Sequence, residues 1–72
     1  MNDNLVLKNK LKRIRRGMSD MTQEQLAMAS GCTRQTIAAL EKGLYNPSLK
    51  LALMISSALG VSVEEIFSLG EE

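Results

Sequence analysis

The sequence is poor in the residues on which several common protein chemistries depend. Its 72 residues include no histidine, one cysteine (Cys32) and one proline. The lack of histidine excludes zinc fingers of the Cys/His type and acid–base catalysis by histidine. A single cysteine cannot form an internal disulfide. We therefore expect a chain that is held together by packing and that works in a reducing compartment, the cytoplasm.

Aromatic residues and long apolar runs are scarce as well. Tyr45 and Phe67 are the only aromatic residues, so the bases of single-stranded nucleic acid would find little to stack on. The N-terminal apolar run, Leu5 to Leu7, is far shorter than a signal-peptide core or a membrane span. No glycine-rich phosphate loop is present, and Glu64 and Glu65 are neighbours that do not converge on one site. We expect neither an enzyme nor a membrane protein, and no cofactor or metal.

Charge is balanced overall but unevenly distributed. The net charge is +1, yet six of the nine basic residues lie between positions 8 and 16, and four of the eight acidic residues lie between positions 64 and 72. A solvated, lysine-rich helix face would account for the basic run by itself. The separation of the two signs also suits a molecule that presents one positive pole to a polyanion.

A chain of this length allows one small domain, in which about 60% of the unfolded surface can be buried. The first predicted helix begins near the N-cap Asn9 and ends at a break from Gly17 to Asp20. A later helix begins after Ser48 and ends at Gly60, and a last one begins at the Ser62–Glu65 capping box. The apolar residues expected on the buried faces of the first and the later helix are Leu11, Ile14, Met18, Leu49, Ala52, Ile55 and Leu59, and the last helix runs through Ile66 and Phe67. We expect residues 70–72 to fray.

The stretch from Thr22 to Gly43 has the clearest local signals. Thr22 and Gln25 have the spacing of a capping box, which predicts the start of a helix. Gly31 supplies a turn that needs a left-handed backbone conformation, and Thr33 is placed to cap a second helix that Gly43 ends. The small residue Ala27 would let these two helices cross closely. The pattern predicts two short helices joined by a tight turn.

The outer face of the second of these helices carries an unusual set of residues. With Ile37 and Leu40 buried, a helical period of about 100° per residue leaves the opposite side for Gln35, Ala39 and Lys42, with Arg34 and Ala38 at its edge. Arginine can bond both acceptors on the guanine edge, glutamine can do the same on adenine, and an alanine methyl can pack on the thymine methyl. These side chains suit the major groove of duplex DNA.

The sequence as a whole resembles a known family of regulators. The run RQTIAALEKGLYNPSLKLAL, preceded by MTQEQLA and followed by ALGVSVEEIF, is similar to the Cro/cI-type (Xre-like) helix-turn-helix proteins over residues 9–69. The resemblance implies an all-α, five-helix, lambda-repressor-like domain between an N-terminal arm (1–8) and an acidic tail (70–72), with a short terminal strand pairing as an option. It also implies a transcriptional regulator, a repressor in our interpretation, that binds a palindromic operator as a homodimer.

Particular residues take on roles through this resemblance. Those assigned to base edges are Arg34, Gln35, Ala38 and Ala39, and those assigned to the DNA backbone are Gln23, Thr33, Lys42, Tyr45 and Asn46. Ala38 departs from the polar residue that many relatives carry, which implies fewer direct base bonds and more dependence on DNA shape. An arginine of the first helix pairs with Glu41; Arg15 and Arg16 both fit, and we favour Arg15 because it follows the core residue Ile14.

A homodimer is expected because one recognition helix contacts too few base pairs for useful selectivity. The residues that we expect at the dimer interface are Leu5, Val6, Leu7, Ile66, Phe67 and Leu69, the first three as strands at the two-fold axis. The alternative is an antitoxin-like module that holds a second protein through its apolar ends. The long flexible extension typical of such modules is missing from this sequence.

Overall fold

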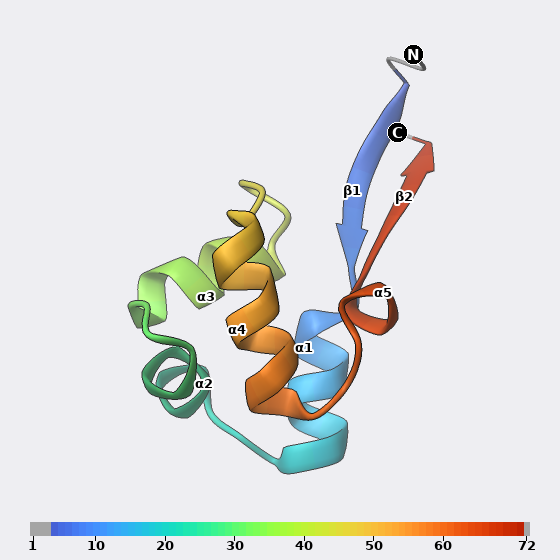
Figure 1. The fold of residues 1–72 in the computed structure, drawn as a ribbon. Helices are drawn as coiled ribbons and strands as arrows, with labels where there is room; N and C mark the ends of the chain where they lie inside the picture. Colours follow the sequence, from blue (N-terminus) through green and yellow to red (C-terminus); the bar gives the residue numbers. More distant parts are fainter. Residues whose placement is uncertain (1–3, 72) are drawn as a thin grey trace.

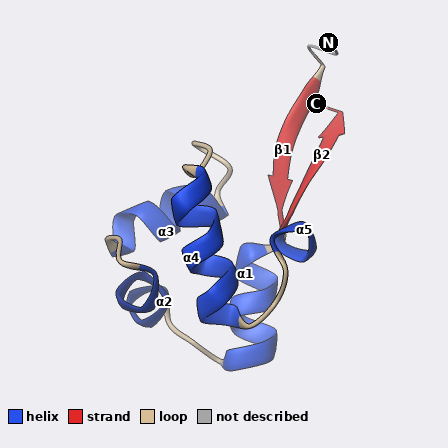
Figure 2. Cartoon of the chain, in the orientation of Figure 1, coloured by secondary structure: helices blue, strands red, loops and turns tan. Residues whose placement is uncertain are grey.

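The computed structural model describes residues 4–71, without the side chains of Met18 and Ser19. Its elements in chain order are β1 (Leu5–Asn9), α1 (Leu11–Ile14), a π-helical segment η1 (Arg15–Ser19), α2 (Gln23–Ser30), α3 (Arg34–Glu41), α4 (Leu49–Leu59), α5 (Val63–Ile66) and β2 (Phe67–Glu71). Helices dominate this part of the chain, and the two strands form a small ribbon at one side (Figures 1 and 2). The expected all-α class therefore holds only roughly. None of the described helices is both long and apolar enough to cross a bilayer.

Side-chain caps fix the starts of the later helices where the sequence predicts them. The hydroxyls of the N-cap residues accept hydrogen bonds from backbone N–H groups of the first turn in α2 (Thr22), α3 (Thr33), α4 (Ser48) and α5 (Ser62). Both predicted capping boxes are present. The turn that ends α2 has its glycine at φ 74°, in the left-handed region that glycine adopts without strain.

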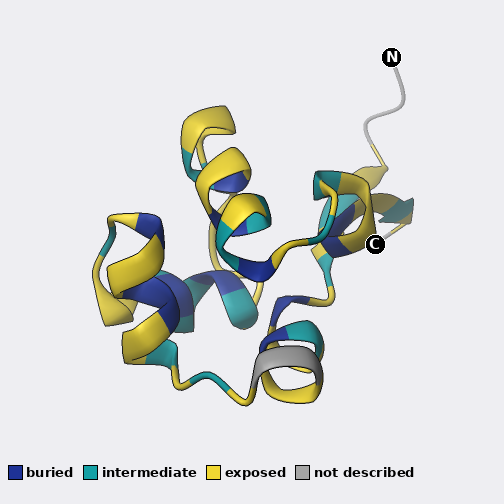
Figure 3. Cartoon of the chain, turned by 60° about the horizontal axis from the view of Figure 1, so that its bottom comes forward, coloured by how far each residue is buried: buried dark blue, intermediate teal, exposed yellow. Residues whose placement is uncertain are grey.

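The core lies where the helices face one another (Figure 3). Its buried apolar side chains come from every helix and from the start of β2: Leu11, Leu26, Ala27, Ile37, Leu40, Ala52, Ile55, Leu59, Ile66 and Phe67. Cys32 packs half-buried against this core, and burial raises the pKa of its thiol. A protonated, packed thiol is a poor nucleophile, which agrees with a structural role for this cysteine.

The first helix differs from its prediction at both ends. It begins at Leu11, two residues after Asn9, and it continues through Gly17 as the π-helical segment, ending at Ser19 with Asp20 in the left-handed conformation at φ 51°. The N-cap residue is Lys10 and not Asn9 as predicted, although the Asn9 side chain, one residue earlier, accepts a hydrogen bond from the Leu11 N–H at 3.1 Å. The placement expected for Met18 on the buried face lies outside the described side chains.

The two ends of the chain pair with each other. Strands β1 and β2 are antiparallel, with Leu5 opposite Glu71 and Leu7 opposite Leu69. This pairing provides the terminal strands that the sequence left as an option. It also corrects our expectation that the tail frays, because Gly70 and Glu71 belong to β2; residue 72 lies outside the described part.

Three apolar residues lie where we did not expect them. Leu49, predicted in the core, is 74% exposed, because it belongs to the first turn of α4, where its neighbours Ser48 and Lys50 are exposed as well. Ile66 and Phe67, predicted at a dimer surface, are buried in the core at 1% and 7% exposure. Their side chains cannot contact a second chain while this fold is kept, which removes them from the expected interface.

Candidate nucleic-acid interface

Helix α3 presents a polar surface on a rigid support. Its buried side is anchored by Ile37 and Leu40, both with no exposed surface. At the start of the helix, Arg34 and Gln35 are exposed, and the alanines that follow are half-buried. The small side chains at positions 38 and 39 leave the helix backbone near the surface, where a partner could approach it closely.

The turn between α2 and α3 sets the angle between these two helices. The Cys32 N–H donates to the Ala27 carbonyl at 3.0 Å, and Ala27 itself is 1% exposed. A larger residue at position 27 would push the two helices apart. The close crossing predicted from Ala27 and Gly31 is therefore present, and it holds the start of α3 beside the start of α2.

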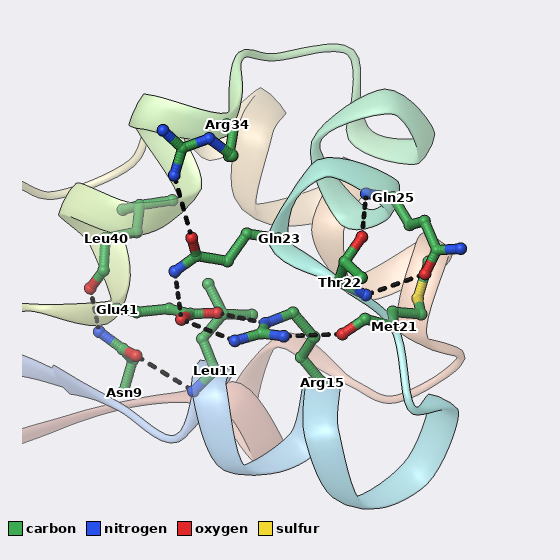
Figure 4. A network of polar contacts seen from close by, with 10 residues as sticks. All are labelled: Asn9, Leu11, Arg15, Met21, Thr22, Gln23, Gln25, Arg34, Leu40 and Glu41. Atoms are coloured by element: carbon green, nitrogen blue, oxygen red, sulfur yellow. Dashed lines mark hydrogen bonds and ion pairs between the residues drawn. The ribbon is translucent and has the colours of Figure 1, made fainter.

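A buried ion pair ties α3 to the first helix (Figure 4). The Arg15 Nε donates to Glu41 Oε2 at 2.7 Å and its Nη2 donates to Glu41 Oε1 at 3.1 Å. The two side chains are only 8% and 3% exposed. The remaining guanidinium nitrogen donates to the Met21 carbonyl at 2.7 Å. Arg16 is exposed, so Arg15 is the arginine that pairs with Glu41.

The surroundings of Glu41 keep its carboxylate charged. Burial by itself acts to raise the pKa of Glu41, but hydrogen bonds from Arg15 and Gln23, together with the positive charges of Arg15 and Lys12, outweigh burial and lower it. The pair is therefore ionised at neutral pH. Two-point contact between a guanidinium and a carboxylate also fixes orientation, so the end of α3 is held at a defined place against α1 and η1.

This pair makes the free energy of unfolding depend on pH. Because the pKa of Glu41 is lower in the folded chain than in the unfolded one, its stabilisation is present above pH 4.5 and is lost as the pH falls through the lower, folded-state value. We expect the difference in unfolding free energy between wild type and Glu41→Gln to shrink as the pH falls from 7 to 3. Urea denaturation at several pH values measures this, with Glu24→Gln, an exposed glutamate of α2, as the matched control. A difference that stays constant with pH would contradict the assignment.

Gln23 connects the ion pair to the exposed start of α3. Its Nε2 donates to Glu41 Oε1 at 3.1 Å, and its Oε1 accepts from Arg34 Nη1 at 3.5 Å. In the free chain the amide of Gln23, which we assigned to a phosphate, therefore forms hydrogen bonds with Glu41 and Arg34. A line of polar contacts runs from Arg34 to Arg15 (Figure 4). No local sequence pattern indicates these links, because the partners are 11 and 18 residues apart.

The other residues assigned to the DNA backbone lie at the two ends of α3. Thr33 caps the start of the helix by accepting from the Thr36 N–H at 3.2 Å. Lys42, Tyr45 and Asn46 are exposed at and beyond the other end. The structure therefore does not gather these residues at one point but places them on both sides of the α3 surface.

Asn9 has a second role that sequence reasoning missed. While its Oδ1 accepts from the Leu11 N–H, its Nδ2 donates to the Leu40 carbonyl at 2.8 Å. One amide therefore satisfies a backbone group at the start of α1 and another in the last turn of α3. The Asn9–Leu40 hydrogen bond and the Arg15–Glu41 ion pair are thus two separate contacts that hold α3 against the N-terminal part of the chain.

Within residues 4–71, no group of three or more histidine, cysteine or acidic side chains is placed to hold a metal ion.

Comparison with known proteins identifies the motif. A family model described as Helix-turn-helix matches residues 11–66, from α1 through α5. The chain belongs to the Cro/cI-type helix-turn-helix family. In this family's terms, α2 and α3 are the two helices of the motif, and α3 is its second helix.

Relatives of this helix-turn-helix protein carry regulatory names. The chain is 54% identical over 61 residues to an uncharacterized HTH-type transcriptional regulator from Methanocaldococcus jannaschii, covering 85% of this chain and 91% of that one. It is 37% identical over 60 residues to the control protein C.MunI of a Mycoplasma species, covering 83% and 81%. It is 40% identical over 52 residues to the immunity repressor protein of Bacillus phage phi105, covering 72% and 35%. The chain is thus a member of a family of helix-turn-helix transcriptional regulators.

Proposed function

We propose that this protein binds duplex DNA at specific sequences by placing α3 in the major groove, and that it regulates transcription there without catalysis. The observation that supports this most is the exposed face of α3, which has groove-compatible side chains and is anchored to the first helix by the buried Arg15–Glu41 pair. Exposed arginine and glutamine side chains can distinguish base edges. Because the helix that carries them is already held in place, little conformational entropy is lost when it binds.

The dimensions of α3 fit the groove. An α-helix with its side chains is about 10 to 12 Å across, and the major groove of B-DNA is about 12 Å wide. Gln23 contacts both the first residue of this helix, Arg34, and its last, Glu41. Thr33 lies at the start of the helix, and Lys42, Tyr45 and Asn46 lie at and beyond its end. In the proposed complex each group contacts the phosphate backbone at one edge of the groove.

Base contacts come from the start of α3 in this proposal. Arg34 bonds the acceptors of a guanine, and Gln35 bonds an adenine. The methyl groups of Ala38 and Ala39 pack against thymine methyls or leave room for the groove edge. When DNA binds, the Arg34 contact with Gln23 orients both side chains, so that Gln23 can turn its second amide hydrogen to a phosphate.

We further propose a homodimer on a palindromic operator, with repression as its effect. The immunity repressor protein among the relatives favours repression over activation. A two-fold partner about 34 Å away doubles the number of base pairs contacted. With Ile66 and Phe67 buried, the interface that remains from our expectation is the outer part of the ribbon, where Leu5 is 41% and Leu69 is 66% exposed and Val6 and Leu7 are half-buried.

The ribbon interface predicts the effect of a surface substitution. In a two-fold dimer each leucine is buried twice, and a buried leucine contributes about 1.5 to 3 kcal/mol. We expect Leu69→Gln to raise the dimer dissociation constant at least ~10-fold, as measured by equilibrium sedimentation at micromolar concentration. Met28→Gln, at a 75% exposed methionine on α2, is the matched control and should leave association unchanged. Equal effects of the two substitutions, or a wild type that stays monomeric, would contradict this interface.

The experiment that tests the whole proposal is a selection of bound sequences from random duplex DNA. It gives the preferred site, its symmetry and the spacing of its halves. We expect a two-fold symmetric site whose half-sites are centred about one helical turn apart. Enrichment of no sequence would rule out specific recognition, and an enriched site without symmetry would rule out the two-fold dimer.

A further inference from the structure

A basic groove lies along the first helix and reaches the end of α3 at Glu41. It has a volume of about 740 Å³, and its lining includes Lys10, Lys12, Arg13, Arg16, Asp20 and Glu41. Helical spacing puts Lys12 and Arg16 on one side of α1 and η1, away from the buried Leu11 and Arg15. The groove therefore gathers basic residues from the run that the sequence places between positions 8 and 16.

The charges in this groove do not cancel. Of its two acidic residues, Glu41 is neutralised by Arg15, which lies in the interior and does not line the groove. Within residues 4–71 the Arg15–Glu41 contact is the one ion pair, so Asp20 pairs with none of the four cations. Four positive side chains thus face one free carboxylate. Such an excess in a concave surface concentrates anions.

The groove adjoins the candidate DNA surface. Glu41 forms part of its wall and also accepts the hydrogen bond from Gln23, which in turn contacts Arg34. Figure 4 shows this line of side chains running from α3 down to the first helix. A duplex strand that passes the start of α2 can therefore continue over α1 and η1 without leaving the surface of the molecule.

We propose that this groove holds the phosphate backbone of the same duplex, beyond the base pairs that α3 contacts. This inference rests on the proposed function, from which it takes duplex DNA as the partner. It adds Lys12, Arg13 and Arg16 as residues that bind the DNA backbone. These cations supply affinity without sequence preference, because phosphates are the same at every step. The net charge of +1 is therefore a poor guide to the attraction between this protein and DNA, because the positive charge is concentrated in the groove that the DNA backbone would occupy.

Salt dependence of binding tests the groove directly. The probe is a mixed-sequence duplex longer than two helical turns, titrated from about 50 to 200 mM salt. Each phosphate contact contributes about 0.9 to the slope of log affinity against log salt. We expect Arg13→Gln/Arg16→Gln to reduce the slope by about 1.8 and the affinity at low salt at least ~10-fold. Arg13→Gln alone should reduce the slope by about half as much.

Lys8→Gln is the matched control, because it removes one positive charge from β1, outside the groove. It should leave the slope nearly unchanged. Arg13 and Arg16 are exposed, and circular dichroism verifies that their variants fold. A second measurement needs no variant of the protein: wild type should lose affinity for a duplex whose phosphates flanking the half-site are neutral methylphosphonates, and the double variant should lose almost none.

The outcomes separate this inference from the proposed function. An unchanged slope in the double variant, or an equal change in Lys8→Gln, overturns the groove while sequence selection by α3 can still stand. A reduced slope together with no enriched sequence supports the groove and overturns specific recognition. Equal loss of affinity for the methylphosphonate duplex in wild type and double variant also overturns the groove.

Discussion

Arg15→Ala is expected to lower the free energy of unfolding by about 3 to 5 kcal/mol, the largest effect of any single substitution considered for this chain. The substitution leaves the Glu41 carboxylate, which is 3% exposed, without its cationic partner. It also frees the Met21 carbonyl, which loses a hydrogen bond of 2.7 Å. A domain of this length has little more stability than that to lose, so we expect most of the variant to be unfolded at 25 °C.

Urea denaturation followed by circular dichroism measures this effect. The matched control is Arg16→Ala, the adjacent exposed arginine, which should change stability by less than about 0.5 kcal/mol. Arg15→Lys keeps the charge but cannot make the two-point contact with the carboxylate, so we expect an intermediate loss. Similar losses for Arg15→Ala and Arg16→Ala would show that the buried pair does not hold α3 in place.

Arg34→Ala is expected to cost about 1 to 3 kcal/mol of binding free energy on the preferred sequence and to relax selectivity at one base pair. The cost is concentrated there because a bidentate contact with guanine discriminates between bases, whereas a phosphate contact does not. Gln35→Ala should have an effect in the same range at a different base pair. Fluorescence anisotropy with the preferred duplex and with single-base variants of it gives both quantities.

Lys42→Ala provides the contrast at the opposite end of the same helix. Its side chain is exposed at the C-terminal end of α3, where we assign it to a phosphate. We expect it to weaken binding to all sequences alike and to reduce the salt slope by about 1. If Arg34→Ala and Gln35→Ala weakened all sequences equally, as Lys42→Ala should, the assignment of α3 to the base edges would be wrong.

Much of the fold could be predicted because its signals are local. A capping hydroxyl and its target N–H are three residues apart, so Thr22, Thr33, Ser48 and Ser62 marked the helix starts correctly. The π-helical segment has no such signal, and the helix therefore passed through the predicted break at Gly17. Periodicity also fails at helix ends, where a residue in phase with the core can lie beyond it, as Leu49 does.

The parts that could not be predicted depend on contacts between distant residues. The pairing of β1 with β2 joins the two ends of the chain, and this pairing, with the fold of α5, draws Ile66 and Phe67 into the core. The link from Arg34 through Gln23 to Glu41 joins the two helices α3 and α2 across 11 and 18 residues. The Arg15–Glu41 pair, 26 residues apart, was predicted from family resemblance, and the choice between Arg15 and Arg16 rested on the neighbouring core residue.

Sequence selection by wild type and Arg34→Ala, carried out side by side on random duplex DNA, tests the central claim most directly. We expect a two-fold symmetric site for wild type. For Arg34→Ala we expect the same site with the preference lost at one base pair in each half, the position that Arg34 contacts. Identical enriched sites for the two proteins would contradict base recognition by the start of α3.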